Sequence, residues 1–321
     1  MLIDDVLSVP AWCVEPSVVV IGNFDGVHRG HAAVLQLAMD YAKERSLPTV
    51  VLTFHPHPSS VLQPIPPPLL TTLDRRVELL ARFGVSRVYA RRFDARFARC
   101  TPEQFVRHLL VEQLQAKAVV VGHNFRFGAD RAGDFETLST WGERLGFAAL
   151  RAPLVEDAKG AVSSSRVRDA LAIGDLSEVE HVLGRHHGIT GTVIAGGGRG
   201  RTLGFPTANL DDIPELLPLQ GVYAVLVNEL DGENVVALSK GVMNIGVRPT
   251  FERDSSRKVE VHLFDIDRDL YGKLLRVHPV ARLREEQRFE NQNALREQID
   301  RDVRAARERT ARIEPIEGAF E

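Results

Sequence analysis

Residues 22–31, GNFDGVHRGH, decide how the first half of this 321-residue chain is interpreted. They follow a short apolar run at 17–22, and apolar residues then recur at helical spacing over 34–42. This pattern predicts a strand, a turn and a helix. The glycines let the backbone approach a ligand, and His28 and His31 lie one turn apart at a helix N-terminus, whose free amides favour anions. The segment therefore predicts a cradle for nucleotide phosphates.

The same alternation of strand and helix continues outward from this segment to about residue 160. Apolar runs at 48–54, 86–93 and 116–122 are expected strands, and 72–84 and 105–114 are expected helices. Thr101, Pro102 and Gln104 supply an N-cap, a first-turn proline and a capping-box partner for the second helix. Alternation of this kind predicts α/β architecture, a doubly wound parallel sheet.

The residue pattern of the sequence changes near Gly184. Short β-branched runs separated by glycine and turn residues follow, which is typical of a small β-barrel, and 291–311 forms a terminal helix. The expected strands lie at 189–198, 221–228, 235–247, 257–265 and 274–283. We therefore predict two domains, 1–184 and 185–321.

Composition limits the partners of the chain. Its 40 basic and 43 acidic residues give a net charge of −3, which offers no overall attraction to nucleic acid or to an anionic membrane. The start, MLIDDVLSVP, is acidic where a signal peptide needs a basic region, and no run of about 18 apolar residues occurs. We expect a cytoplasmic protein with small-molecule substrates, no nucleic-acid or membrane partner and an undetermined oligomeric state.

The first domain contains two further segments of this kind, one after a predicted strand and one at the start of a predicted helix. GHNFRFG at 122–128 follows a buried strand, and VSSSRVR at 162–168 offers hydroxyls and amides to an anion. Neither a P-loop nor a dinucleotide fingerprint is present at 22–31. An isolated pair of histidines is more often structural, but three such segments together favour nucleotidyl transfer, in which the attacking phosphate needs alignment and charge-stabilising donors.

The second domain carries its own phosphate-type segment, GGGRGRTLGFPTANL at 196–210. Thr207 and Asn209 alternate by two, so both oxygens can face magnesium and a nucleotide phosphate, or else bond their own backbone in a turn. Further on, Glu260 lies opposite the apolar face of the predicted strand 257–265. A strand carboxylate is usually only solvated, but one near these groups could act as a general base.

These segments resemble a known family. GNFDGVHRGH, TFHPHP, GHNFRFG and SSSRVR look like the FMN adenylyltransferase module of prokaryotic bifunctional riboflavin kinase/FAD synthetases. GRTLGFPTANL, GVYAV, GVMNIGVRPTF and KVEVHLFDIDRDLYG look like the riboflavin kinase module of the same enzymes. The resemblance implies phosphorylation of riboflavin to FMN and adenylylation of FMN to FAD and pyrophosphate, with ATP and Mg²⁺ required.

The resemblance also implies a role for each matching residue. In the adenylyltransferase the expected catalytic residues are His28 and His31, the expected ATP contacts also include Gly22, Phe24, Ser164 and Arg168, and the expected flavin contacts are Phe54, Pro56, Pro58 and Asn124. In the kinase the expected phosphate contacts are Gly198, Gly200, Thr207 and Asn209, the last two also holding Mg²⁺, and the expected catalytic base is Glu260. Ala161, Ser165 and Asn124 stand where the family often has a basic residue, threonine and aspartate.

Other readings of the sequence remain open at this point. His-x-Gly-His also occurs in enzymes that adenylylate pantetheine phosphate or nicotinate nucleotides, but these lack a β-rich second half. One module could instead have lost turnover and serve as a flavin-binding or regulatory domain. Relatives that charge tRNA would need a basic surface, which the balanced charge does not predict.

Overall fold

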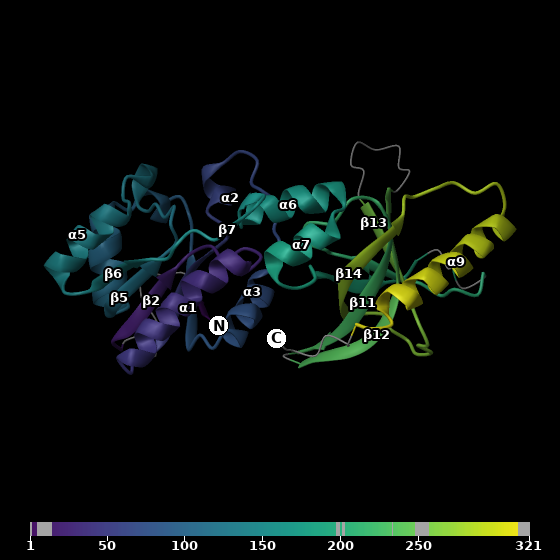
Figure 1. Cartoon of the computed structure of the whole chain (residues 1–321), viewed down its shortest axis with the longest axis horizontal. Helices are drawn as coiled ribbons and strands as arrows, with labels where there is room; N and C mark the ends of the chain where they lie inside the picture. The colour runs from purple at the N-terminus through teal and green to yellow at the C-terminus, as the bar shows by residue number, and fades with distance from the viewer. Residues whose placement is uncertain are drawn as a thin grey trace. The chain divides into compact units, whose positions relative to one another are not determined.

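The structure is a computed structural model that describes residues 2–4, 15–196, 200, 203–232, 234–247 and 257–313. The chain forms two compact units (Figure 1). The first unit comprises Met1–Pro68 and Thr72–Ser164, and the second comprises Leu69–Thr71 and Ser165–Glu321. Each unit is described by itself.

The first unit is built on a parallel six-stranded sheet with the order β1-β4-β3-β2-β5-β6. Its strands are β1 (Leu2–Asp4), β2 (Ser17–Ile21), β3 (Thr49–His55), β4 (Arg87–Arg92), β5 (Ala116–Val121) and β6 (Ala148–Arg151). The chain leaves β2 toward β3 and β4 and then returns to β5 on the other side of β2. The strand order therefore reverses direction beside β2, and in open α/β sheets ligands bind outside such a switch point.

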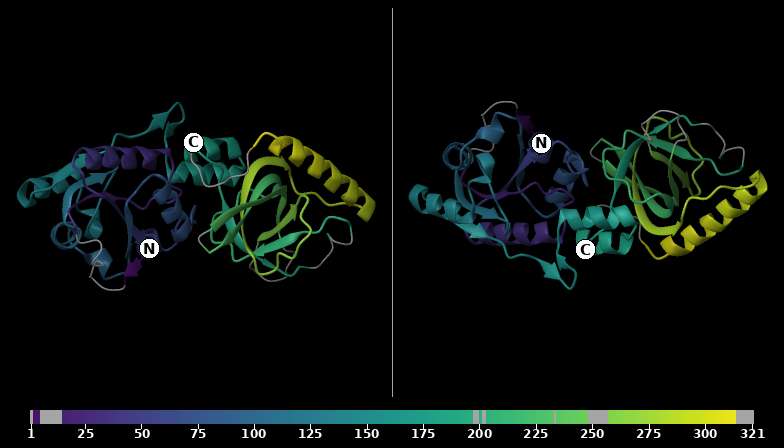
Figure 2. Two further views of the ribbon diagram at one scale, coloured as in Figure 1. Left: turned by 90° about the horizontal axis from the view of Figure 1, so that it is seen from below. Right: turned by 90° about the horizontal axis from the view of Figure 1, so that it is seen from above.

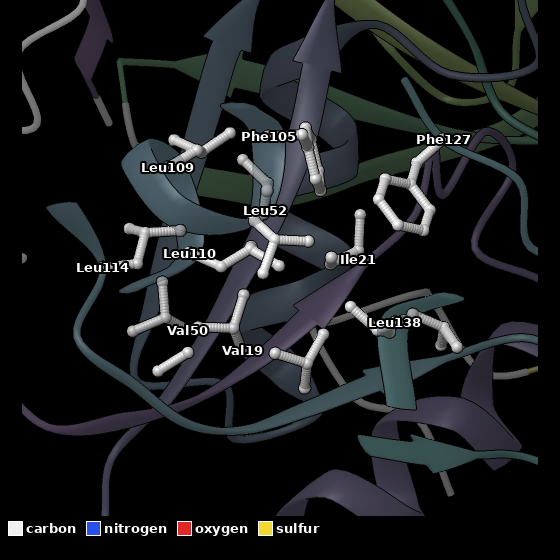
Figure 3. Packing of buried hydrophobic residues seen from close by; sticks show 14 of the residues in the cluster. Val19, Ile21, Val50, Leu52, Phe105, Leu109, Leu110, Leu114, Phe127 and Leu138 are labelled. Carbon is white, nitrogen blue, oxygen red and sulfur yellow. The ribbon is translucent and has the colours of Figure 1, made fainter. Parts of the chain in front are cut away.

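Helices cover both faces of this sheet, which explains why its central strands are apolar throughout. On one face, helix α5 (Phe135–Leu145) and the helical segment η3 (Phe105–Gln113) pack on alternate residues of β2 and β3 (Figure 3). On the other, α1 (Arg29–Glu44) contacts β2, β3 and β5, and α3 (Leu73–Arg82) contacts β4. Shorter helical segments are α2 (Ser59–Leu62), η2 (Phe97–Arg99), α4 (Pro102–Gln104) and η4 (Ala129–Arg131), and β7 (Glu156–Asp157) pairs with β8 (Gly160–Ala161).

The helix predicted over 105–114 differs from the expectation in its winding. Thr101 and Gln104 form the predicted capping box, and Pro102 opens the helix. From Phe105 onward the segment is a π-helix, and the Leu114 N–H donates to Leu109 O. Sequence periodicity does not separate this wider winding from an α-helix, because both place apolar residues on one side.

The second unit is a closed six-stranded antiparallel barrel with the order β10-β13-β12-β11-β14-β9 (Figure 2). Its strands are β9 (Ile189–Ile194), β10 (Ala208–Asp211), β11 (Gly221–Asp231), β12 (Asn234–Val247), β13 (Arg257–Leu263) and β14 (Leu274–Arg284). Side chains alternate along each strand, so Val259 and Val261 fill the barrel while Glu260 faces outward. Closure leaves no unpaired strand edge.

Helix α9 (Gln292–Thr310) lies against the outside of the barrel, along β11, β12 and β14 (Figure 2). Ala306 packs with Val222, Val242 and Phe264 of the barrel wall. Arg284 donates to both carboxylate oxygens of Asp302, at 3.0 Å and 2.8 Å. The helix is thus a packing element of the second unit, as its balanced charges predict.

Helices α6 (Ser164–Ile173) and α7 (Leu176–Leu183) precede the barrel in the chain. In the second unit, α7 contacts β14, and the Leu219 N–H donates to Leu171 O at 2.9 Å. The Leu216 N–H donates to Leu69 O at 2.7 Å, which explains why Leu69–Thr71 belongs to this unit. The second unit therefore contains helices α6 and α7 and the segment Leu69–Thr71 in addition to the barrel and α9.

Candidate functional site

The histidine turn caps helix α1 in both directions. His28 is the N-cap residue, and its Nδ1 accepts the His31 N–H at 3.3 Å. In return, His31 Nδ1 accepts the His28 N–H at 3.3 Å. The two rings stack with centroids 3.6 Å apart and an interplanar angle of 19°. Two histidines thus form a capping box, a role more often filled by serine or threonine with glutamate.

This reciprocal cap fixes the tautomer of both rings. A nitrogen that accepts a backbone N–H carries no proton, so the neutral form of each ring is protonated at Nε2. Both Nε2–H groups are therefore hydrogen-bond donors, on adjacent stacked rings at a helix N-terminus. An arrangement of two donors and a positive helix dipole can stabilise negative charge on phosphate oxygens.

Three adjacent strands bring the predicted adenylyltransferase segments to one edge of the sheet. β3, β2 and β5 are parallel neighbours, and Ile21 is paired with both Leu52 and Val121. The segments after these residues, which contain Gly22, Phe54–Pro58 and Asn124, therefore lie at the same end of the sheet. The sequence predicted that these segments follow strands, and their adjacency is a property of the strand order.

The serine segment is joined to the histidine turn inside the first unit. Ser164 Oγ donates to Asp25 O at 2.8 Å. Gly30 lies so close to this segment that an added Cβ would come within 3.0 Å of Val162 O. Ser164, expected as an ATP contact, thus holds the turn through its hydroxyl, while Arg168 lies four residues further along α6, in the second unit.

A buried arginine lies beneath the histidine turn, and the sequence interpretation missed it. Arg76 and Asp25 are each 2% exposed, with Nη2 and Oδ1 3.9 Å apart. Arg76 also donates to Thr53 Oγ1 and Phe54 O, both at 3.4 Å, and burial lowers its pKa. The arginine therefore connects the end of β3 to the turn after β2. Its position in an amphipathic helix gave no signal, because arginines on such helices are mostly exposed.

The expected flavin-side residues differ in exposure. Phe54 is buried and meets Phe93 edge to face, with centroids 5.7 Å apart, whereas Pro56 and Asn124 are exposed. Pro58 is half-buried before α2. Burial, and next the guanidinium of Arg76, lower the pKa of His55 at the end of β3, which favours the neutral form of this ring. Phe24 is also buried and packs against His31, with the two ring centroids 5.0 Å apart.

In the barrel, strand register places the expected kinase residues in one row. Asn209 of β10 is paired with Glu260 of β13, which is paired in turn with Asn244 of β12. Residues directly opposite each other on antiparallel strands have side chains on the same face. The row lies on the outer face, since Val259 and Val261 point inward. Asn244 is a member of this row that sequence reasoning missed.

Two glycines, Gly196 and Gly200, lie close to one end of this row. A Cβ added to Gly196 would overlap the amide of Asn209, and one added to Gly200 would overlap Phe205 O and approach Thr207 Oγ1 to 3.2 Å. The His262 ring nitrogen Nδ1 lies 2.8 Å from Pro206 O. Gly200, Thr207 and Asn209 are therefore close together, whereas Gly198 and residues 248–251 of the GVMNIGVRPTF segment lie outside the described residues.

Glu260 is not simply a solvated carboxylate. Its side chain is 29% exposed, and its Oε1 accepts a hydrogen bond from Lys258 Nζ at 2.6 Å. Lys258 was not among the residues predicted for the site. The signal was present in the sequence, because residues two apart on a strand share a face.

These arrangements define a class of protein. A parallel sheet with an anion-binding helix N-terminus at its switch point suits transfer at a phosphate, and a carboxylate beside a glycine loop on a barrel suits a second such transfer. The fold and the two sites are those of a transferase that handles phosphate groups at two places.

Comparisons with known proteins identify the family. A family model described as FAD synthetase matches residues 11–166, and one described as riboflavin kinase matches residues 183–310. The bifunctional riboflavin kinase/FMN adenylyltransferase of Escherichia coli K12 is 42% identical over 295 residues, covering 92% of this chain and 93% of the relative. The enzyme of the same name from Bacillus subtilis 168 is 36% identical over 295 residues, and the match covers 90% of this chain and 91% of that relative.

The chain belongs to the bifunctional riboflavin kinase/FMN adenylyltransferase family. The predicted family, fold class and pair of enzyme activities are confirmed. A solved structure described as a macrolide-efflux protein from Streptococcus pneumoniae shares the fold, with a TM-score of 0.82 and 31% identity over 92% of this chain and 94% of that chain. No helix in the described part of this chain is long and apolar enough to cross a membrane.

Proposed function

We propose that the first unit adenylylates FMN and the barrel unit phosphorylates riboflavin, each with its own ATP. The observation that carries this assignment is the pair of stacked histidines, whose neutral rings carry their protons on Nε2 at the switch point of the sheet. Purified protein given riboflavin, ATP and Mg²⁺ should form FMN first and then FAD. Accumulation of FMN alone would contradict the role given to the first unit.

In the adenylyl transfer, an oxygen of the FMN phosphate attacks the α-phosphorus of ATP, and the bond to pyrophosphate breaks. The attacking oxygen is already anionic, so no base is needed. His28 and His31 donate to the charge that develops on the phosphate oxygens. The expected ATP contacts Gly22, Phe24, Ser164 and Arg168 and the flavin contacts Phe54, Pro56, Pro58 and Asn124 complete this proposal.

In the phosphoryl transfer, the ribityl hydroxyl of riboflavin attacks the γ-phosphorus of ATP and ADP leaves. Glu260 takes the hydroxyl proton as the O–P bond forms, since an alcohol is a weaker nucleophile than its alkoxide. Gly198 and Gly200 belong to the loop proposed to bind the phosphates. Thr207 and Asn209 orient the terminal phosphate toward the hydroxyl held by Glu260.

The oxygens of Thr207 and Asn209 also fit a magnesium ion. Both are hard ligands, Asn209 is 8% exposed, and the close approach of Gly196 and Gly200 fixes their positions. Magnesium in phosphate-transfer sites usually takes few protein ligands and completes its shell with phosphates and water. When bound, it would neutralise charge on the transferred phosphate.

Gly196 offers a test of this geometry. Replacing Gly196 with alanine should lower the kinase rate by roughly 100-fold, because the new Cβ displaces the amide of Asn209 and a misplacement of about 1 Å can have an effect of that size. Conversion of supplied FMN to FAD should stay within about twofold of the parent rate. The urea unfolding midpoint of Gly196→Ala, compared with that of the parent, distinguishes a displaced amide from an unfolded barrel. A normal kinase rate in Gly196→Ala would remove Asn209 from the proposal.

The domain boundary at 184/185 leads to a second test. A fragment of residues 165–321 keeps α6 and α7, whereas a fragment of 185–321 loses their contacts with the barrel unit. We expect the longer fragment to phosphorylate riboflavin without making FAD, and the shorter one to be less stable in urea unfolding. Equal stability of the two fragments would show that the barrel folds without these helices.

Riboflavin, FMN, FAD and ATP are the substrates and products that the family activities imply. A cytoplasmic location, the lack of a nucleic-acid or membrane partner and the Mg²⁺ requirement remain predictions. Fractionation of cells and a magnesium titration of both activities would test the first and the last of these.

A further inference from the structure

Glu260 has a charged neighbour on its own strand. Lys258 Nζ donates to Glu260 Oε1 at 2.6 Å, and the two side chains are 35% and 29% exposed. The contact joins residues two apart on β13, so it depends on the strand alone and needs no loop to form. The structure thus shows Oε1 of this carboxylate bound by the ammonium.

The residues paired with Glu260 are uncharged, but a second carboxylate lies close to Lys258. Glu260 lies between Asn209 on β10 and Asn244 on β12. Lys258 is paired with Gly246 of β12, where an added Cβ would overlap the carboxylate of Glu286. With both carboxylates nearby, the ammonium donates its hydrogen bond to Glu260 Oε1.

Lys258 lies on the side of Glu260 away from the expected phosphate groups. Ala208 is paired with Val261, so Thr207, one residue earlier on β10, lies toward His262. The contact between His262 and Pro206 O agrees with this direction. Lys258 lies two residues from Glu260 in the opposite direction along β13. This placement indicates that Lys258 acts on Glu260 and does not bind a phosphate group.

We propose that Lys258 is a positioning residue for the kinase reaction: its ammonium holds Glu260 Oε1, so that Oε2 faces the ribityl hydroxyl of riboflavin. The inference rests on the proposed function of Glu260 as the base. In the step, the hydroxyl proton moves to Oε2, the new O–P bond forms, and the bond from the γ-phosphorus to ADP breaks. A glutamate has three side-chain torsions, and holding one oxygen removes conformations in which the other cannot accept the proton.

The test uses the full-length chain with riboflavin, ATP and Mg²⁺. Lys258→Met should lower the kcat of FMN formation about 10-fold and leave the KM for ATP unchanged, since a displaced base slows the chemical step without altering nucleotide binding. Lys258→Arg keeps the charge and should recover most of the rate. Lys273→Met is the matched control, because Lys273 also pairs with a barrel glutamate, Glu229, at 3.3 Å. Conversion of FMN to FAD by each variant reports on the first unit, and the urea unfolding midpoint reports on the barrel.

A double-mutant cycle separates positioning from other roles. In a Glu260→Gln background, Lys258→Met should cause no further loss in single-turnover phosphorylation, because the lysine acts through the carboxylate. The same 10-fold loss in that background would show that Lys258 acts on a substrate, and would overturn the inference. A normal or raised kcat for Lys258→Met would overturn it as well.

The cycle also distinguishes this inference from the proposed function. If Glu260→Gln phosphorylates riboflavin slowly and Lys258→Met does so at the normal rate, the role of Lys258 is rejected and Glu260 remains the base. If Glu260→Gln phosphorylates riboflavin at the normal rate, Glu260 is not the base, and the role of Lys258 is rejected as well.

Discussion

Replacing Glu260 with glutamine should slow phosphorylation of riboflavin by roughly 100-fold to 10,000-fold. The change keeps the size of the side chain and much of its hydrogen bonding, but an amide oxygen cannot take the hydroxyl proton. Stability should hardly change, because the side chain lies on the outer face of the barrel and its ion pair with Lys258 is partly exposed. Separation of FMN and FAD over time would measure the loss.

Supplied FMN provides the internal control for this variant. Most residues proposed for adenylylation belong to the first unit and none lies on β13, so Glu260→Gln should convert FMN to FAD at nearly the parent rate. Glu229→Gln is the matched control, because it makes the same change at another barrel glutamate that pairs with a lysine, on β11 away from the row of Asn209, Glu260 and Asn244. A normal kinase rate in Glu260→Gln would assign the proton to another acceptor, or to water.

The second large effect is expected at the histidine turn. Losing one charge-stabilising donor should reduce FAD formation by roughly 100-fold to 1000-fold, while FMN accumulates. Alanine would confuse this result, because His28 and His31 also cap helix α1 and loss of a cap destabilises by about 1 kcal/mol. The reciprocal geometry suggests better substitutions.

His28→Asn keeps an acceptor for the His31 N–H, since asparagine is among the best N-cap residues. His31→Gln keeps the reverse bond, since glutamine is a usual capping-box partner. Both variants should unfold near the parent urea midpoint and still lose FAD synthesis. If either retains full FAD synthesis, that ring is a cap and not a catalytic donor.

Much of the fold follows from local patterns in the sequence. The apolar runs and capping signals predicted β2, β3, β4 and β5 of the sheet, and the alternation in 257–265 predicted which face of β13 carries Glu260. Such signals act over a few residues, so they can be read before the fold is known. The π-helical winding of 105–113 and the early start of the second unit were not predicted, because each depends on tertiary packing.

The sequence predicted which elements carry the candidate site residues but not the contacts between them. Sequence spacing placed His28 and His31 at a helix N-terminus, yet their mutual cap depends on ring orientations that a pattern does not contain. The bond from Ser164 to Asp25 joins residues 139 apart, and Asn244 joins the row of Glu260 only through strand register. Contacts across such distances depend on topology, which motifs alone do not specify.

The reciprocal cap has an evolutionary consequence. Under the proposed function the same two imidazoles cap α1 and donate to phosphate oxygens, so selection for folding and selection for catalysis act on one pair of codons. A neutral replacement would have to supply a cap and a donor at once, and a change in one ring removes the partner of the other. This pair should therefore drift more slowly than residues that serve either purpose alone.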